Sequence, residues 1–212
     1  MNHYNIEKYI DYQFGGNCYS ISFENFMIIV DPCVSYENVK KKCHNFKEIK
    51  AIFITHGHFD HFNELYSYLI NTNAKIYLHK NAIVKLSSSA QNCSALFGNP
   101  IKVDSNLIND RVIAISDNVF TIDEIQFESK YFPGHSDCCV SLMFDNNIFV
   151  GDFIFKRSVG RTDLYTSSNV MMGLSLKKFK ELKLNLFNIY CGHGDNTTFE
   201  DEIKYNSYLN RL

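Results

Sequence analysis

Three histidines and one aspartate lie within six consecutive positions of the chain, at His56, His58, Asp60 and His61. They directly follow the apolar run 51–54 (AIFI), which predicts a buried strand. Imidazole and carboxylate groups are the usual ligands for zinc and iron, and alternate residues of an extended turn point the same way. His56 and His58 can therefore bind one ion while Asp60 and His61 reach a second. A random chain of this composition would contain the pattern roughly 7 × 10⁻⁴ times, so the segment predicts a metal site at a strand end.

Three further candidate ligands, His135, Asp152 and His193, each follow a strand-like segment and have a glycine beside them. A single histidine or aspartate near a turn is usually an ordinary surface residue. Glycine, however, lets the backbone approach a site closely, and a carboxylate has two oxygens that can bridge cations about 3.5 Å apart. Together with the 56–61 cluster, these residues predict a site for two metal ions built from several strand ends.

The elements that must position these residues follow from the hydrophobic periodicity. Segments 17–23 and 26–30 flank a turn and predict a hairpin, and the later strands predict a second, mostly antiparallel sheet. Alternating strands and helices favour an α/β layered domain. The stretch 81–100 is expected to form a short helix and a loop near the site mouth. The predicted strands are 17–23, 26–30, 49–54, 75–78, 119–122, 125–132, 140–144, 148–150 and 187–191, and the predicted helices are 39–46, 62–70 and 170–186.

The composition indicates a globular protein that acts on small molecules. With 45% apolar and 15% aromatic residues among 212, the chain suits one domain, residues 1–212. The formal net charge is −2 and the basic residues are scattered. Neither nucleic acid nor an anionic membrane surface is therefore an expected partner.

The cysteines and the N-terminal residues predict a cytoplasmic location. Seven cysteines without a C-x-x-C pair are expected to be reduced thiols. Cys138 and Cys139 are expected on a strand, facing opposite sides as packing groups, and Cys191 is also expected to be a packing group. Residues 1–12 lack a signal pattern, and no apolar run approaches the roughly 18 residues that a membrane helix needs.

The order of the ligands, H-x-H-x-D-H followed by His, Asp and His, resembles the metallo-β-lactamase superfamily over nearly the whole chain. Within that superfamily the chain is most similar to short glyoxalase II-like (hydroxyacylglutathione hydrolase-like) enzymes. The phrase GRTDL at 160–164 is the most discriminating feature, because the ligand set is shared by the whole superfamily. The resemblance implies a four-layered αββα sandwich of the metallo-β-lactamase type, with the metals in a cleft at one edge. The other matching phrases are 55–61, 133–136, 151–155, 192–194 and 197–198, with Glu202 and Asn206 after them.

The resemblance also implies a division of the ligands between two metals, and all seven positions hold the expected residue type. The chain departs from the family in two places. It is expected to lack the helical C-terminal domain that binds glutathione in full-length glyoxalase II, so the resemblance leaves the thiol carrier open. Asp195 and Asn196 stand where the family often has a proline. The implied ligands are His56, His58 and His135 for the first metal, Asp60, His61 and His193 for the second, and Asp152 as the bridge.

The expected function is a dinuclear metal-dependent hydrolase of small-molecule thioesters, of the hydroxyacyl-glutathione type. Two divalent ions, zinc foremost and otherwise iron or manganese, would share a water and lower its pKa toward about 7, so that hydroxide attacks the acyl carbonyl. A thiolate leaves readily, so no strong general acid is required. Asp60 is expected to serve as ligand and as catalytic proton acceptor.

Several alternatives stay open. Persulfide dioxygenases of the same superfamily hold a single iron with two histidines and one aspartate and keep most of the motif. Lactone or other ester hydrolysis on the same fold is a further option, and phosphodiester hydrolysis is disfavoured because there is no basic patch. A binding module with a vestigial site is disfavoured because no ligand is lost. The oligomeric state is left open.

The remaining candidate residues are expected to have structural roles or to line the cleft. Arg161 and Asp163 are expected to form an internal salt bridge rather than to bind substrate. Tyr165 is expected to face the cleft. The histidines that match no ligand position, His3, His44 and His79, are expected to be ordinary surface or core residues.

Overall fold

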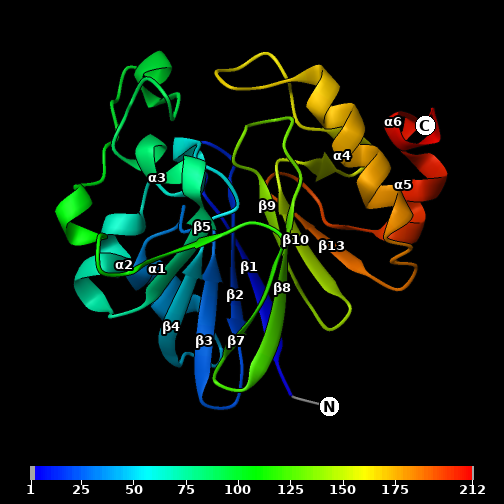
Figure 1. The fold of residues 1–212 in the computed structure, drawn as a ribbon. Coiled ribbons are helices and arrows are strands. Elements are labelled where there is room, and N and C mark those ends of the chain that lie inside the picture. Colours follow the sequence, from blue (N-terminus) through cyan, green and yellow to red (C-terminus); the bar gives the residue numbers. More distant parts are fainter. Residues whose placement is uncertain (1–2, 212) are drawn as a thin grey trace.

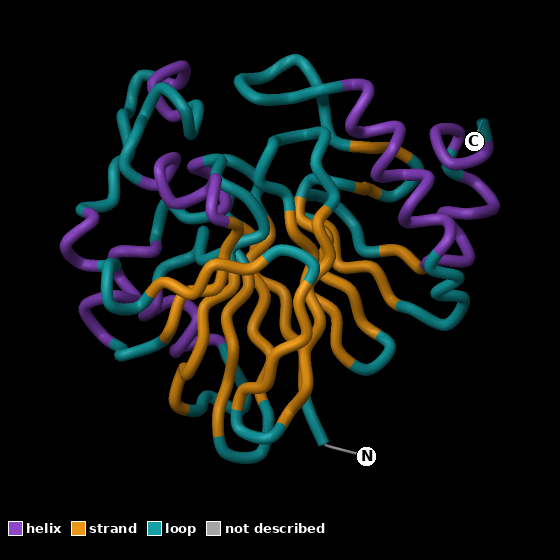
Figure 2. Tube along the Cα trace, in the orientation of Figure 1, coloured by secondary structure: helices purple, strands orange, loops and turns teal. Residues whose placement is uncertain are grey.

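Two six-stranded sheets pack face to face and are covered on both outer faces by helices, as the computed structural model of residues 3–211 shows (Figures 1 and 2). The helices α1, α2 and α3 cover one sheet, and α4, α5 and α6 cover the other (Figure 1). This is the predicted four-layered αββα sandwich, with mixed α/β content and two sheets.

The first sheet is formed by the N-terminal half, with its strands in sequence order from β1 to β6. The pairs β1–β2 and β2–β3 are antiparallel, and β3 to β6 are parallel. The pair β2–β3 is the predicted hairpin, which is thereby confirmed. Helices supply the long connections that parallel strands need. The strands are β1 Asn5–Ile10, β2 Asn17–Ser22, β3 Phe26–Val30, β4 Glu48–Phe53, β5 Lys75–His79 and β6 Val112–Ile115, and the helices are α1 Tyr36–Lys42, α2 Leu65–Asn71 and α3 Lys80–Leu86.

The second sheet has the order β14-β13-β10-β9-β8-β7. All its pairs are antiparallel except β10–β13, whose crossover contains the longest helix, α4. The prediction of a mostly antiparallel second sheet is therefore confirmed. The strands are β7 Asn118–Ile122, β8 Ile125–Tyr131, β9 Val140–Phe144, β10 Asn147–Gly151, β13 Asn188–Cys191 and β14 Thr197–Thr198, with the small hairpin β11 Ile154–Phe155 and β12 Ser158–Val159 beside them. The helices are α4 Asn169–Glu181, α5 Phe199–Tyr205 and α6 Ser207–Asn210.

The core has three apolar layers because both sheets are buried on both faces. Successive side chains of a strand point to opposite faces. On β3, Ile28 faces the layer between the sheets, while Met27 and Ile29 face the layer under the N-terminal helices. A third layer lies under α4 to α6 and includes Phe179.

Several details of the predicted elements are wrong. Helix α1 spans Tyr36–Lys42 and not 39–46. Helix α4 ends at Glu181 and not at residue 186 as predicted, and Leu186 is 80% exposed. Helix α2 begins at Leu65 and not at the predicted residue 62, and its buried face includes Tyr68. Cys138 and Cys139 lie in the turn before β9 and not on a strand.

The cysteines of the described residues are all buried and unpaired, as expected of reduced thiols. Within residues 3–211, no helix has the length and apolar character needed to cross a membrane.

Candidate metal centre

The seven predicted ligands converge at one edge of the sandwich, on the loops that follow β4, β8, β10 and β13. Three groups of them have ligand atoms that all lie within 4.8 Å of one another. We call the first group the three-imidazole set and the third the mixed set. The groups are His56, His58 and His135; His56, His61 and Asp152; and Asp60, His61 and His193.

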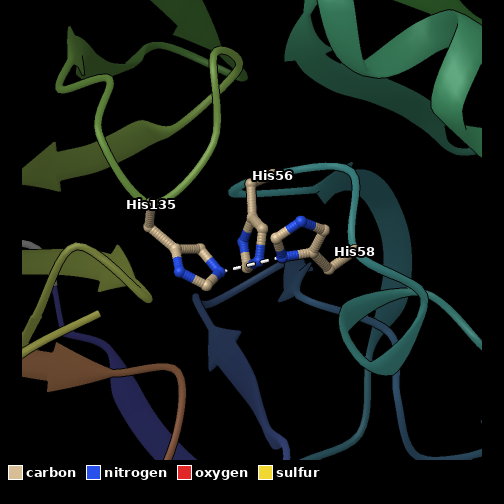
Figure 3. Close-up of side chains that lie close together, drawn as sticks. All are labelled: His56, His58 and His135. Atoms are coloured by element: carbon tan, nitrogen blue, oxygen red, sulfur yellow. Dashed lines mark hydrogen bonds between the residues drawn. The ribbon is translucent and has the colours of Figure 1, made fainter. Parts of the chain in front are cut away.

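The three-imidazole set brings together two segments that are distant in sequence (Figure 3). His56 and His58 come from the loop after β4, and His135 comes from the loop after β8. The Nδ1 atom of His58 and the Nε2 atom of His135 lie 2.8 Å apart. The ring of His56 is 4.8 Å from that of His58 and 4.9 Å from that of His135, centre to centre. The three rings therefore aim at one point.

The mixed set lies beside it, with Asp152 between the two. The Nε2 atom of His193 lies 3.2 Å from Asp60 Oδ2. The carboxylate of Asp152 contacts both sets, because Oδ1 is 3.2 Å from His61 Nε2 and Oδ2 is 3.5 Å from His135 Nε2. The structure thus places Asp152 where the resemblance implies a bridging ligand.

The residues fit a cation. Among the described residues, the buried atoms His56 Nε2, His61 Nε2 and Asp152 Oδ1 make no hydrogen bond of good geometry, although the last two lie 3.2 Å apart. Leaving a buried polar atom unpaired costs about 1–3 kcal/mol, so native structures rarely do so without a reason. These three atoms belong to one of the groups within 4.8 Å. A divalent cation bound there would satisfy all of them.

Partners behind the imidazoles turn the Nε2 atoms toward the centre. His61 Nδ1 donates to Asp31 Oδ2 at 2.9 Å, and His135 Nδ1 donates to the carbonyl of Arg161 at 2.8 Å. The hydroxyl of Thr55 donates to Asp31 and lies 3.1 Å from His56 Nδ1, so it accepts from that nitrogen. Such outer partners fix the tautomer and the orientation of metal-binding histidines.

Asp31 and Thr55 were missed by the sequence analysis. Asp31 is buried at the end of β3 and also accepts from the backbone N–H of Thr55 at 2.7 Å. Its signal in the sequence is the Asp31–Pro32 step, which by itself indicates only the end of the predicted strand 26–30. Its position beside β4 in a parallel pair could have shown that it reaches the same edge as His56.

The three-imidazole set is electrically neutral. Burial, and next the neighbouring imidazole of His61, hold the pKa of His56 well below its usual value. Burial and His135 lower the pKa of His58 to about 3, and burial lowers the pKa of His135. Only neutral imidazole can ligate a metal, so these three rings are ready to bind.

The mixed set is charged. Burial alone would lower the pKa of His61, but Asp152 and Asp31 outweigh it and raise that pKa. The pKa of His193 is also raised, because Asp60 and Asp152 outweigh the effect of burial. Burial would raise the pKa of Asp60, yet His61 lowers it. These side chains form an ion-paired cluster in which a cation would take the place of protons.

Glycine is required at two positions beside the ligands. Gly151 has φ +54°, and a Cβ there would lie 2.3 Å from Thr55 Oγ1. A Cβ on Gly192 would lie 2.3 Å from Asp152 Oδ1. Neither contact is possible for a larger residue, so the predicted role of glycine in close approach is confirmed at both strand ends.

A cavity of about 220 Å³ opens onto the ligands. A larger cavity of about 610 Å³, near Phe23 and Asp123, is lined by none of them. The predicted short helix and loop at 81–100 contribute to the smaller cavity through Cys93 and Phe97, as expected of a segment near the site mouth. The cavity is lined by His58, Phe59, Asp60, Cys93, Phe97, His135, Asp152, Arg161, Leu164 and His193.

The remaining assignments have mixed outcomes. Arg161 and Asp163 form the predicted salt bridge, with N···O distances of 2.6 and 2.8 Å, but both side chains are exposed rather than internal. The prediction that Tyr165 faces the cleft is wrong, because Leu164 lines the cavity instead and Tyr165 is 54% exposed to solvent.

The histidines outside the site, and Cys191, are ordinary residues as predicted. His44 is exposed beside Glu7, and His79 is buried with its ring stacked on Tyr131. His3 is exposed. Cys191 packs in the layer under the C-terminal helices.

Comparison with known proteins agrees with this geometry. The chain is 30% identical to a probable metallo-hydrolase of Streptococcus pyogenes, over 96% of this chain and 90% of that protein. It is 27% identical to the hydroxyacylglutathione hydrolase GloC of Haemophilus influenzae, over 97% of this chain and 98% of that protein. The crystal structure of BLEG-1 B3 metallo-beta-lactamase superposes with a TM-score of 0.85 at 26% identity and covers 97% of this chain and 99% of its own.

The family model of the metallo-beta-lactamase superfamily matches residues 11–193. That range contains all seven candidate ligands and every strand of the two sheets except β1 and β14. The chain therefore belongs to the metallo-beta-lactamase superfamily, whose members include metal-dependent hydrolases.

Proposed function

We propose that this metal-dependent hydrolase binds two divalent cations and cleaves small-molecule thioesters of the hydroxyacyl-glutathione type. The observation that carries the proposal is the convergence of a complete set of seven ligands, in which Asp152 touches both the three-imidazole set and the mixed set. The similarity to a hydroxyacylglutathione hydrolase over nearly the full length of both chains supports the thioester class. Zinc is the first choice of metal, with iron or manganese as alternatives, because the ligand set suits all three.

When bound, a pair of cations would supply an acidified water and a Lewis acid for the acyl oxygen. The side chains of the protein hold and orient the reactants. Asp31 and Thr55 keep His61 and His56 turned toward the centre. Asp60, whose carboxylate lies on the cavity wall, is held by His193.

The role of Asp60 is better supported as a ligand than as a base. The imidazole of His61 keeps its pKa low despite burial, so the carboxylate stays ionised. A carboxylate with a low pKa is a weak proton acceptor, so the predicted catalytic role of Asp60 stays a prediction. The reaction makes little demand on an acid, because a thiol of pKa about 8.5 leaves readily as thiolate.

The cavity would receive the acyl end of the substrate. Its apolar wall is formed by Phe59, Phe97 and Leu164. A volume of about 220 Å³ is below the roughly 300–1,000 Å³ of pockets that enclose drug-sized ligands. Only part of a thioester would fit inside, so the thiol carrier would extend along the surface.

Persulfide oxygenation is the second candidate. It needs one iron held by two histidines and one aspartate, and the group of His56, His61 and Asp152 has this composition. We favour hydrolysis because the remaining four ligands would then have no role.

We further propose that the enzyme acts on dissolved small molecules in the cytoplasm, without nucleic acid or membrane. The net charge of −2 and the unpaired state of the buried cysteines among the described residues support this.

Elemental analysis of the purified protein, combined with a panel of thioesters that includes S-lactoylglutathione, tests the proposal. We expect about two metal ions per chain, and release of free thiol from at least one thioester. One iron per chain with oxygen uptake on glutathione persulfide would favour the dioxygenase. Metal-loaded protein that is inactive on every thioester would refute the substrate class.

A further inference from the structure

A buried lysine lies behind the metal centre, on a helix that carries none of the candidate ligands. Lys85 is in the last turn of α3, and only 1% of its surface is exposed. Its ammonium donates to Ser136 Oγ at 2.6 Å, Asp137 Oδ1 at 2.5 Å and Thr166 Oγ1 at 2.6 Å. An ammonium has three N–H groups, so these acceptors use all of them. Lysine is almost never buried without such partners.

The three acceptors surround the segment that carries His135. Ser136 and Asp137 follow His135 directly in the chain. Thr166 belongs to the loop 160–168, in which the carbonyl of Arg161 accepts from His135 Nδ1. The ammonium of Lys85 therefore joins α3 to the turn that presents His135 and to the loop that orients its ring.

The aliphatic stem of Lys85 contacts the segment that carries His56 and His58. A Cβ added to Gly57, which separates His56 and His58, would lie 2.8 Å from both Cβ and Cδ of Lys85. The backbone of the His56–His58 turn thus packs directly on the stem. One side chain touches both segments that build the three-imidazole set.

The conformation of Thr166 indicates that the contact between Lys85 and its three acceptors is rigid. Its φ of +63° lies in the left-handed region, which is an outlier for a β-branched residue. Such strain persists only where the surroundings hold the residue in place. The hydroxyl of Thr166 is held by Lys85 and lies 3.4 Å from Ser136 Oγ.

A nucleophilic role for this pair is excluded by burial. A serine next to a lysine is a known catalytic arrangement. Here, however, Ser136 is fully buried, and the ammonium of Lys85 is occupied by three acceptors. Substrate cannot reach either group.

We propose that Lys85 is a positioning residue that fixes His135 relative to His56 and His58, and thereby sets the affinity of the three-imidazole set for its cation. The inference rests on the metal site of the proposed function and is independent of the substrate.

The test is a metal titration of three proteins: the parent chain, Lys85→Met and Lys80→Met. Lys85→Met keeps an aliphatic stem and removes the ammonium. Lys80→Met is the matched control, because Lys80 is exposed on the same helix. Zinc affinity is measured by competition with a chelator, and the absorption of cobalt(II) reports the ligand geometry.

We expect Lys85→Met to bind the first zinc equivalent about ten- to hundredfold more weakly, the usual cost of losing an outer partner of a metal site. Its cobalt spectrum should also change, while Lys80→Met matches the parent chain. Parental affinity and spectrum in Lys85→Met would overturn the inference and leave the proposed function intact. A parent chain that binds no cation would overturn both.

Asp137→Asn is the second variant, for the case that Lys85→Met does not fold. It removes the charge that pairs with Lys85 but keeps the shape of the side chain, and Asp137 is partly exposed. We expect a smaller loss of zinc affinity in the same direction. Unchanged affinity and an unchanged cobalt spectrum in this folded variant would contradict the inference.

Discussion

The two sets of candidate ligands differ in charge and in exposure. In the three-imidazole set, burial keeps His56, His58 and His135 neutral, and none of them is more than 3% exposed. In the mixed set, carboxylates raise the pKa of His61 and His193 against the effect of burial, and the side chain of His193 is 28% exposed. The three-imidazole set therefore presents the lone pairs of neutral imidazoles, whereas the mixed set presents ion-paired histidines and carboxylates.

This difference in charge determines how each set would bind a cation. A cation entering the three-imidazole set meets rings that carry no ionising proton. A cation entering the mixed set competes with the protons of His61 and His193. We therefore expect a tight site with little pH dependence beside a weaker site that strengthens as the pH rises.

Asp152→Ala should have the largest effect, because this carboxylate touches both halves. We expect thioester hydrolysis to fall by about 10³-fold or more, since losing one well-placed electrostatic group already costs about 10²–10³. Turnover is measured in protein of verified metal content, with Asp163→Ala as an exposed control. Near-parental turnover in metal-loaded Asp152→Ala would refute the site.

Asp31→Asn should separate the two halves. Asp31 accepts directly from His61 Nδ1, whereas it reaches the three-imidazole set only through Thr55, whose hydroxyl accepts from His56 Nδ1. We expect the affinity of the mixed set for zinc to fall about 10- to 100-fold, with the three-imidazole set much less affected. Two-step metal titration measures both values. An equal loss at both steps would mean that the halves are not distinct.

The pH dependence of zinc affinity should differ between the mixed set and the three-imidazole set. Because carboxylates raise the pKa of His193 and His61, these rings hold protons at a pH where free histidine has lost them. Zinc must displace those protons, so the affinity of the mixed set should rise with pH below the raised pKa values, by up to about tenfold per unit for each proton released.

The three-imidazole set is the internal control for this measurement. Burial and His135 lower the pKa of His58 to about 3. Its zinc affinity should therefore change little between about pH 5 and 8. Parallel pH slopes at the two steps of the titration would contradict the assignment of charge.

Phe97→Ala should have the smallest effect. Phe97 lines the cavity, is 63% exposed and packs beside Phe59 with ring centres 5.1 Å apart. Removing it takes away apolar surface that substrate would contact, so we expect KM to rise several-fold for apolar acyl groups with kcat nearly unchanged. Leu186→Ala, an exposed apolar residue outside the cavity, is the control. A fall in kcat alone would mean that Phe97 positions the ligands and not the substrate.

Much of the fold followed from periodicity, and the errors have physical causes. The strands around Ile28 and Phe149 read clearly because both of their faces are buried. Strand β1 was missed because three of the six residues in its sequence, NIEKYI, are polar and it lies at the edge of its sheet. The end of α4 was missed because Leu182 and Leu186 continue its apolar pattern, although Lys183 adopts φ +52° and ends the helix.

The ligands could be found from the sequence because histidine and aspartate beside glycine at strand ends are rare in combination. The residues that support these ligands could not be found from the sequence. Asp31 and Lys85 are single residues of common types, and their roles depend on segments between 24 and 81 positions away in the chain. Only the fold brings those segments together.

The most direct test is a crystal structure of the protein grown with zinc, with anomalous scattering used to locate the metal. We predict two metal peaks about 3.5–4 Å apart. One should lie among His56, His58 and His135, the other among Asp60, His61 and His193, with Asp152 contacting both. A single peak held by two histidines and one aspartate, or no peak among these seven residues, would contradict the account.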